Sequence, residues 1–176
     1  MLPTRKTTRL QGYDYAQEGM YYVTICANER ECRFVGATLV VARESTPLNA
    51  AGIMVENIWL SIPKLFPNVS LDEYVVMPNH FHGIVVIGDG ECENEYRRAT
   101  TRVAPTPTLG RIIGAFKSIT THRYIMNVKN GTWPPFTTRL WQRNYYEHII
   151  RDDDDLERIR YYIRHNPENW HDDELA

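Results

Sequence analysis

The first feature of this sequence that could do chemistry is a pair of histidines separated by one residue. His80 and His82 stand in the run VVMPNHFHGIVVI (residues 75–87), which predicts β-strand on either side of a turn. Because successive strand side chains point to opposite faces, both imidazoles share one face and Phe81 takes the other. Neutral imidazole is the commonest transition-metal ligand among side chains, so the pair is half of a candidate metal site. Taken alone, His-x-His is more often a pair of ordinary strand histidines.

A second chemical group lies in the last predicted helix, which Asp152 or Asp153 caps. On a helical wheel, Tyr162 falls beside the apolar stripe, Asn166 lies next to it one turn later, and Tyr161 points away. The stripe itself consists of Leu156, Ile159 and Ile163. The helix therefore offers a phenol and a carboxamide on one edge. A tyrosine at such an edge is, taken alone, more often a residue at the rim of the core.

The elements that must position these groups alternate between strand and helix. The pattern predicts a first strand over residues 21–27, with short strands over 33–36 and 39–41. A helix is expected to open at Thr46-Pro47 and to stop near Ile62, before Pro63. Strands over 71–77 and 82–87 form an antiparallel hairpin through Pro78-Asn79. A polar loop over 88–107 leads into a helix over about 108–127.

Length and composition limit the class of protein. A chain of 176 residues with 43% hydrophobic content can bury one core, so we expect one cytoplasmic domain spanning residues 1–176. The sequence has no apolar run of the ~20 residues that a membrane helix needs and no secretory signal pattern. Its three cysteines lack CxxC spacing, which predicts neither a disulfide framework nor a structural zinc site.

The charge is unevenly distributed along the chain. The formal net charge is -2, which argues against a strongly basic coat, but residues 97–164 contain thirteen Lys and Arg against six Asp and Glu, a balance of +7. Basic residues among aromatics could line a groove for a phosphate backbone. A solvated surface with no special role explains the same feature equally well.

Taken together, these features resemble the single-tyrosine HUH nucleases, in particular the REP-associated tyrosine transposases of the insertion-sequence transposase superfamily. The resemblance covers nearly the whole chain and rests on five motifs together. These are RLQGYDY (9–15), YVTIC (22–26), MPNHFH (77–82), LWQRNYYEHIIR (140–151) and YIRHNP (162–167). It implies an α+β fold, in which helices pack on a ferredoxin-like antiparallel sheet and the histidine pair faces the tyrosine helix.

Carried over to this sequence, the resemblance makes Tyr162 the nucleophile, with His80 and His82 as metal ligands and Asn166 as a third ligand. It implies cleavage and rejoining of DNA through a covalent 5′-phosphotyrosine. A donor set of two imidazoles and an amide suits Mg²⁺ or Mn²⁺ better than a structural zinc. Since the free pKa of tyrosine is near ~10, nearby positive charge would favour the phenolate, and Arg158 is a candidate for it.

The substrate implied by the resemblance is single-stranded DNA, in particular a hairpin from a repeated extragenic palindrome. Basic residues that could contact this DNA or its phosphates occur in four regions of the chain; they are Arg5, Lys6, Arg9, Arg97, Arg98, Arg102, Arg143 and Arg158. The sequence leaves open whether the protein is a monomer or a homodimer.

Four neighbouring residues have roles that the sequence does not decide. His148 and Glu147 could be a ligand, a base or a DNA contact, and we favour a supporting or structural role. Tyr145 and Tyr146 compete with Tyr162 as nucleophile, but neither is followed by the amide and proline found at residues 166–167.

Two other functions remain compatible with the same residues. The sheet could form a noncatalytic nucleic-acid-binding module. Alternatively, a metal-dependent hydrolase could use His80, His82 and an activated water, without a covalent intermediate.

Overall fold

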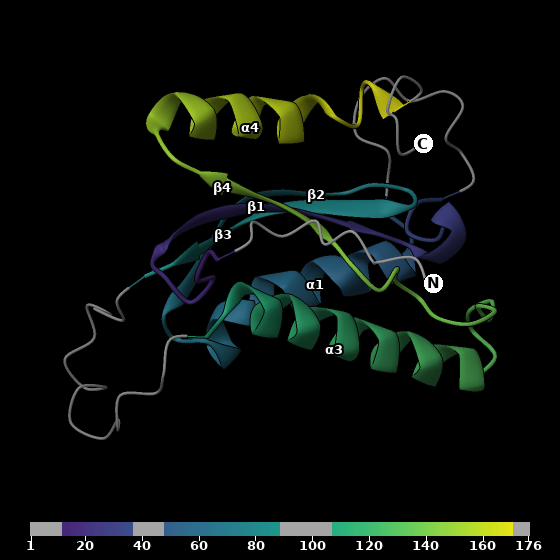
Figure 1. The fold of residues 1–176 in the computed structure, drawn as a ribbon. Helices are drawn as coiled ribbons and strands as arrows, with labels where there is room; N and C mark the ends of the chain where they lie inside the picture. The colour runs from purple at the N-terminus through teal and green to yellow at the C-terminus, as the bar shows by residue number, and fades with distance from the viewer. Residues whose placement is uncertain (1–11, 37–47, 89–106, 171–176) are drawn as a thin grey trace, which may run out of the picture.

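A computed structural model describes residues 12–36, 48–88 and 107–170. It contains a four-stranded sheet with helices on both faces (Figure 1). The elements follow one another as β1 (Gly19–Cys26), a 3₁₀ turn (Asn28–Arg30), α1 (Ala50–Leu65), β2 (Val69–Val76), β3 (His80–Ile87), α3 (Leu109–Lys129), β4 (Tyr146–Ile150) and α4 (Asp153–His165). The expected strand over 39–41 and most of the expected loop over 88–107 lie outside the described residues. Among the described residues, no helix is long and apolar enough to cross a membrane.

The sheet has the strand order β2-β3-β1-β4, and every neighbouring pair is antiparallel. Strands β1 and β3 are therefore central, while β2 and β4 form the edges. With one helix between β1 and β2 and another between β3 and β4, this is the ferredoxin-like βαββαβ arrangement, and the expected α+β fold class is confirmed.

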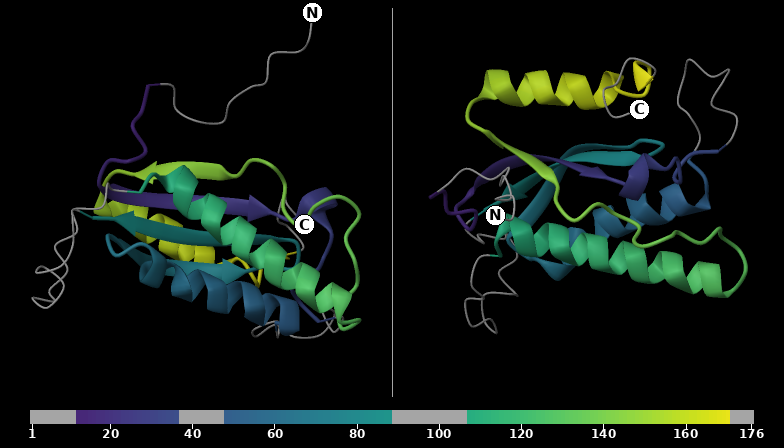
Figure 2. Two further views of the ribbon diagram at one scale, coloured as in Figure 1. Left: turned by 90° about the horizontal axis from the view of Figure 1, so that it is seen from below. Right: turned by 45° about the vertical axis from the view of Figure 1, so that its right-hand side comes forward.

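The two faces of the sheet carry different layers (Figures 1 and 2). Helices α1 and α3 cover one face and enclose the main core, which includes Val23, Phe81, Trp59 and Phe116. Helix α4 covers the other face, where its apolar stripe packs on Ile84 in a second, smaller core. Strand alternation sends Phe81 to the first core and His80 and His82 towards α4.

The main core is tightly packed at Gly83, midway along β3. A Cβ atom built at this position would lie 2.6 Å from the Trp59 ring and 2.8 Å from the Phe81 ring. These distances are far below van der Waals contact, so only glycine lets α1 approach the strand this closely. The close approach holds α1 on the face opposite to the histidines.

Two expected boundaries of the first helix are wrong. The helix begins at Ala50, because the Asn49 side chain accepts from the Ala51 and Gly52 amides, both at 2.9 Å. It also continues through Pro63 to Leu65. A proline this close to the end of a helix removes a single hydrogen bond, while the Phe66 amide still donates to the Ile62 carbonyl at 3.0 Å.

Two of the other expected elements differ in extent or kind. The expected strand over 33–36 is reduced to an isolated bridge between Val35 and Leu48. The helix expected over 108–127 runs from Leu109 to Lys129, with the Thr108 side chain as its cap.

Helix α4 is fixed to the sheet by charge as well as by its apolar stripe. Asp152 caps its first turn by accepting from the Asp155 amide at 2.8 Å. Further along, the Arg160 guanidinium donates to both carboxylate oxygens of Asp72 at 2.8 and 2.6 Å. Two nitrogens of the Arg164 guanidinium donate to a single carboxylate oxygen of Glu73, at 2.9 and 2.5 Å. The helix that carries Tyr162 is thereby tied to the edge strand β2.

Candidate active site

The predicted histidine pair is buried on the face that α4 covers. His80 and His82 are 0% and 1% exposed, and their ring centroids lie 4.5 Å apart. Two adjacent imidazoles on one rigid strand are held at a spacing that a single cation can bridge. The strand geometry expected from the sequence therefore brings the pair together.

Asn79 determines which nitrogen of His80 carries the proton. The side-chain nitrogen of Asn79 donates to the Arg30 carbonyl at 3.2 Å. The side-chain oxygen of Asn79 is therefore the atom that faces His80, 2.7 Å from Nδ1. An amide oxygen can only accept a hydrogen bond. His80 must therefore donate from Nδ1, which leaves the lone pair on Nε2, the atom that would bind a metal.

His82 is held by two hydroxyl groups from β1. Its Nδ1 atom lies 2.7 Å from the Tyr22 hydroxyl and 2.9 Å from the Thr24 hydroxyl, and Thr24 pairs directly with His82 in the strand register. The Tyr22 ring also stacks on His82, with a centroid distance of 5.6 Å. Burial first, and the neighbouring His80 second, hold the pKa of His82 well below its usual value of 6.5, so the ring is neutral at pH 7.

Tyr162 lies against this pair, on the edge of α4. Its ring meets the His82 ring with a centroid distance of 5.4 Å and an interplanar angle of 73°, and meets the Tyr22 ring at 6.3 Å. The residue is 44% exposed, so a substrate can reach it. Tyr161, in contrast, is 64% exposed and stacks on His165, away from the sheet.

Two further side chains lie at and after the C-terminal end of α4, and one of them touches a histidine. Asn166 ends the helix and is 4% exposed. Three residues after Pro167, the Trp170 ring stacks on His80, with a centroid distance of 5.7 Å. Tyr162 and Trp170 thus cover His82 and His80, respectively.

The donor atoms fit a divalent cation. Within residues 12–36, 48–88 and 107–170, His82 Nε2 and Asn166 Oδ1 are buried side-chain atoms that have no hydrogen-bond partner. Burying such polar atoms without a partner costs about 1–3 kcal/mol each, which a bound cation would offset. No cluster of three or more His, Cys, Asp or Glu side chains suited to a metal occurs in these same residues. Of the three expected ligands, the two imidazoles lie side by side, and the Asn166 oxygen is buried without a partner among the described residues.

Arg158 and His148 meet at Asp155 on the first turns of α4. His148 Nε2 lies 2.6 Å from one carboxylate oxygen of Asp155, and the Arg158 guanidinium pairs with the other. Hydrogen bonds from His148, and then from Arg158, lower the pKa of Asp155. His148 therefore has a structural contact, whereas the expected help of Arg158 to the Tyr162 phenolate stays a prediction.

Three other candidates from the same region point in different directions. Tyr145 is 8% exposed and belongs to the main core. Glu147 pairs with Val23, which directs it to the face of α1 and α3, away from the histidines. Tyr146 pairs with Thr24 on the histidine face and is 56% exposed. Of the two tyrosines that compete with Tyr162, only Tyr146 shares its face.

The candidate DNA contacts are mostly not placed. Arg5, Lys6, Arg9, Arg97, Arg98 and Arg102 lie outside the described residues. Arg143 is exposed just before β4, where its carbonyl accepts from the Lys117 ammonium at 3.0 Å.

Sequence reasoning missed four residues that touch the candidate site. Asn79 stands in the same motif as the histidines, so its position next to His80 was a usable signal. The roles of Tyr22, Thr24 and Trp170 depend on strand register and on the path of the chain after α4. No spacing in the sequence reveals these contacts.

Comparisons with known proteins place the chain in a family. It is 36% identical over 180 residues to a Haemophilus influenzae protein described as uncharacterized, and the match covers 97% of this chain and 92% of that protein. The chain therefore belongs to the same family as this protein. No family model matches the sequence.

Two solved structures are similar to the chain at low identity. One is a REP-associated tyrosine transposase bound to a REP hairpin, with 19% identity, a TM-score of 0.48, and coverage of 95% of this chain and 73% of the other. The second is a Deinococcus radiodurans protein described as a candidate transposase, with 15% identity, a TM-score of 0.49, and coverage of 89% and 95%.

Proposed function

We propose that the protein cleaves and rejoins single-stranded or hairpin DNA through a covalent bond to Tyr162, as a single-tyrosine HUH transposase does. The observation that carries this proposal is the contact of the exposed Tyr162 phenol with His82, whose ring neighbours that of His80. Nucleophile and metal ligands then face a single phosphate from opposite elements, α4 and β3.

The proposed reaction exchanges one phosphate ester for another. The Tyr162 hydroxyl oxygen attacks the phosphorus, loses its proton to water, and displaces the 3′-oxygen of the preceding nucleotide, which takes up a proton from water. The products are a 5′-phosphotyrosine and a free 3′-hydroxyl. Because one ester bond replaces another, attack by a 3′-hydroxyl can reverse the step or join the phosphate to a different strand.

The chain would hold Mg²⁺ or Mn²⁺ through His80 and His82, with Asn166 as a third ligand. When bound there, the cation would polarise the non-bridging phosphate oxygens. Asn79 keeps His80 in the tautomer that leaves Nε2 available, and the two hydroxyls on β1 orient His82. The neutral state of His82 at pH 7 also suits a ligand.

The substrate follows from the resemblance of the motifs and from the surface near Tyr162. Tyr146 offers an exposed ring on the same face, and Arg143 offers an exposed cation just before β4. Bases stack on such rings, and cations neutralise the phosphate backbone. We also propose Arg5, Lys6, Arg9, Arg97, Arg98 and Arg102 as DNA contacts.

The decisive test is a covalent labelling experiment. The protein is incubated with 3′-labelled single-stranded and hairpin DNA in the presence of Mn²⁺, and then denatured; a 5′-phosphotyrosine keeps the labelled 3′ part of the strand on the protein. We expect an adduct that survives denaturation and disappears in Tyr162→Phe. The matched control is Tyr161→Phe, because Tyr161 neighbours Tyr162 but faces away from the histidines, and this variant should keep the adduct.

The same experiment separates the alternatives. Cleavage without an adduct would indicate a hydrolase that uses an activated water. Binding without cleavage would indicate a noncatalytic module. An adduct that persists in Tyr162→Phe and disappears in Tyr146→Phe would move the nucleophile to β4.

A further inference from the structure

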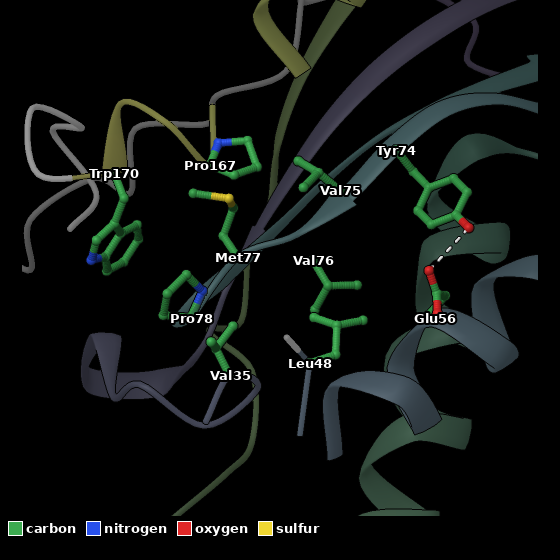
Figure 3. A pocket seen from close by; sticks show the side chains of 10 residues that line it. All are labelled: Val35, Leu48, Glu56, Tyr74, Val75, Val76, Met77, Pro78, Pro167 and Trp170. Carbon is green, nitrogen blue, oxygen red and sulfur yellow. Dashed lines mark hydrogen bonds between the residues drawn. The ribbon is translucent and has the colours of Figure 1, made fainter. Parts of the chain in front are cut away.

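A cavity of about 250 Å³ lies beside the histidine pair, along the outer edge of β2. Figure 3 shows Trp170 and Pro167 on one side of this cavity and Tyr74 with Glu56 on the other. Met77 and Val75 lie between these two sides. The cavity therefore lies between the residues that follow α4 and helix α1, at the end of the edge strand β2.

This cavity shares walls with the candidate active site. Trp170 lines it and also stacks on His80. Val75 lines it and is the strand partner of His82 in the register of β2 and β3. Directly paired strand residues have Cβ atoms only about 5 Å apart, so the wall that Val75 forms adjoins the strand position of His82.

The lining is apolar except at one end. Trp170, Pro167, Met77 and Pro78 offer an indole, two proline rings and a thioether, which suit the faces of a planar ring. At the other end, the Tyr74 hydroxyl donates to Glu56 Oε1 at 3.2 Å. Burial, followed by the charge of Glu56, raises the pKa of Tyr74, so the phenol stays protonated and keeps this carboxylate in place.

We propose that this cavity binds one unpaired nucleobase of the DNA strand, and that Glu56 selects a base with an exocyclic amine. The inference rests on the proposed function, whose substrate it specifies. Adenine, cytosine and guanine each carry an amino group that a carboxylate can accept from, and a glutamate is the residue type that reads the cytosine amine. Thymine has no amine, and its single ring N–H donor lies between two carbonyl oxygens that a carboxylate repels.

Size and charge exclude other ligands. Pockets for drug-sized ligands measure ~300–1,000 Å³, so a smaller cavity takes a single ring system rather than a peptide segment. The only charged lining side chain among the described residues is the acidic Glu56, which would repel a phosphate. A base can therefore enter the cavity while its phosphate stays with the histidines.

The test measures base preference at each position of a bound strand. Tyr162→Phe protein, which cannot cleave, is used in EDTA to select from a random pool of single-stranded oligonucleotides, and the bound fraction is sequenced. We expect one position at which thymine is depleted about ten-fold, within the range that a specific base contact provides. Adding Glu56→Gln should remove this depletion, because a glutamine amide can pair with the carbonyl and imino groups of thymine.

The matched control is Glu18→Gln. Glu18 is exposed and precedes Gly19, which pairs with Ile87 at the end of the sheet away from the histidines. This variant removes the same charge and should leave the base profile unchanged. Tyr74→Phe, which removes only the hydroxyl that holds Glu56, should weaken the depletion without abolishing it.

The results distinguish this inference from the proposed function. Two outcomes overturn the base pocket. One is a base profile that does not change when Glu56→Gln is introduced into folded protein, and the other is a profile in which no position is depleted of thymine. Adduct formation by the wild-type protein with Mn²⁺ tests the proposed function separately. If the adduct forms but the base profile is the same with and without Glu56→Gln, the proposed Tyr162 chemistry stands and only the proposed base pocket is wrong.

Discussion

The side-chain oxygen of Asn79 accepts a hydrogen bond from His80 Nδ1 at 2.7 Å, and this contact between neighbours in sequence sets the tautomer of the first candidate metal ligand. Replacing such a partner of a metal-binding histidine usually lowers metal affinity by about 10–100-fold. We therefore predict that Asn79→Ala binds Mn²⁺ at least about ten-fold more weakly, as measured by electron paramagnetic resonance of the free ion.

Asn79→Asp is the rescue variant for this prediction. A carboxylate keeps the acceptor that His80 Nδ1 requires, so affinity should return to within a few-fold of wild type. Equal Mn²⁺ affinity in the wild type and in folded Asn79→Ala would contradict the assigned role.

Asn166 gives a second test of the cation site. Its buried Oδ1 atom has no hydrogen-bond partner among the described residues, as expected for an oxygen reserved for a ligand. We predict that Asn166→Asp binds Mn²⁺ more tightly than wild type, since carboxylates are preferred by hard cations, and that Asn166→Ala binds it more weakly. Titration calorimetry with Mn²⁺ alone measures both. If neither variant changes the affinity, Asn166 is not a ligand.

Gly83 should tolerate no side chain. A Cβ atom there would lie 2.6 Å from the Trp59 ring, so Gly83→Ala must displace α1 or the strand. We predict a loss of about 1–3 kcal/mol in the free energy of unfolding, measured by urea denaturation. Gly114→Ala is the control, because that position on α3 is exposed and has no atom within 4 Å of the added Cβ. It should gain about 0.5–1 kcal/mol from the higher helix propensity of alanine.

The ion pair between Asp72 and Arg160 predicts a pH dependence. Hydrogen bonds from Arg160 hold the pKa of Asp72 below its usual value of 3.8. A lowered pKa in the folded state gives stability that is present above the usual pKa and lost as the pH falls through the lowered value. We expect Asp72→Asn to cost about 1 kcal/mol at pH 7, with a difference from wild type that shrinks below pH ~4. A difference that stays constant down to pH 2 would show that the ionised pair contributes nothing.

The periodicity of the sequence predicts those parts of the site that depend on a single element. Strand alternation places His80 and His82 on one face, and the helical wheel places Tyr162 beside the buried Ile159 and Ile163. Both follow from geometry that each element imposes on its own side chains.

Features formed between elements could not be predicted in the same way. The contacts of Tyr22 and Thr24 with His82 require the register of β1 against β3, which only the folded sheet defines. The expected stop at Pro63 was wrong because proline costs little in the last turn of a helix. The ion pair between Arg158 and Asp155 was also not predicted. In the sequence both residues are charges on one helix, and nothing indicates that His148 binds the same carboxylate.

The division of the interior into two cores has a consequence for motion. Helix α4 rests on the small core around Ile84 and on side-chain ion pairs, whereas α1 and α3 share the large core on the other face. Segments that bury little apolar surface open at a lower free energy than the rest of a fold. Amide hydrogens of α4 should therefore exchange with deuterium before those of α1 and β3. We expect the spacing between the Tyr162 phenol and the imidazoles to change when this helix opens, while the strand beneath it stays folded.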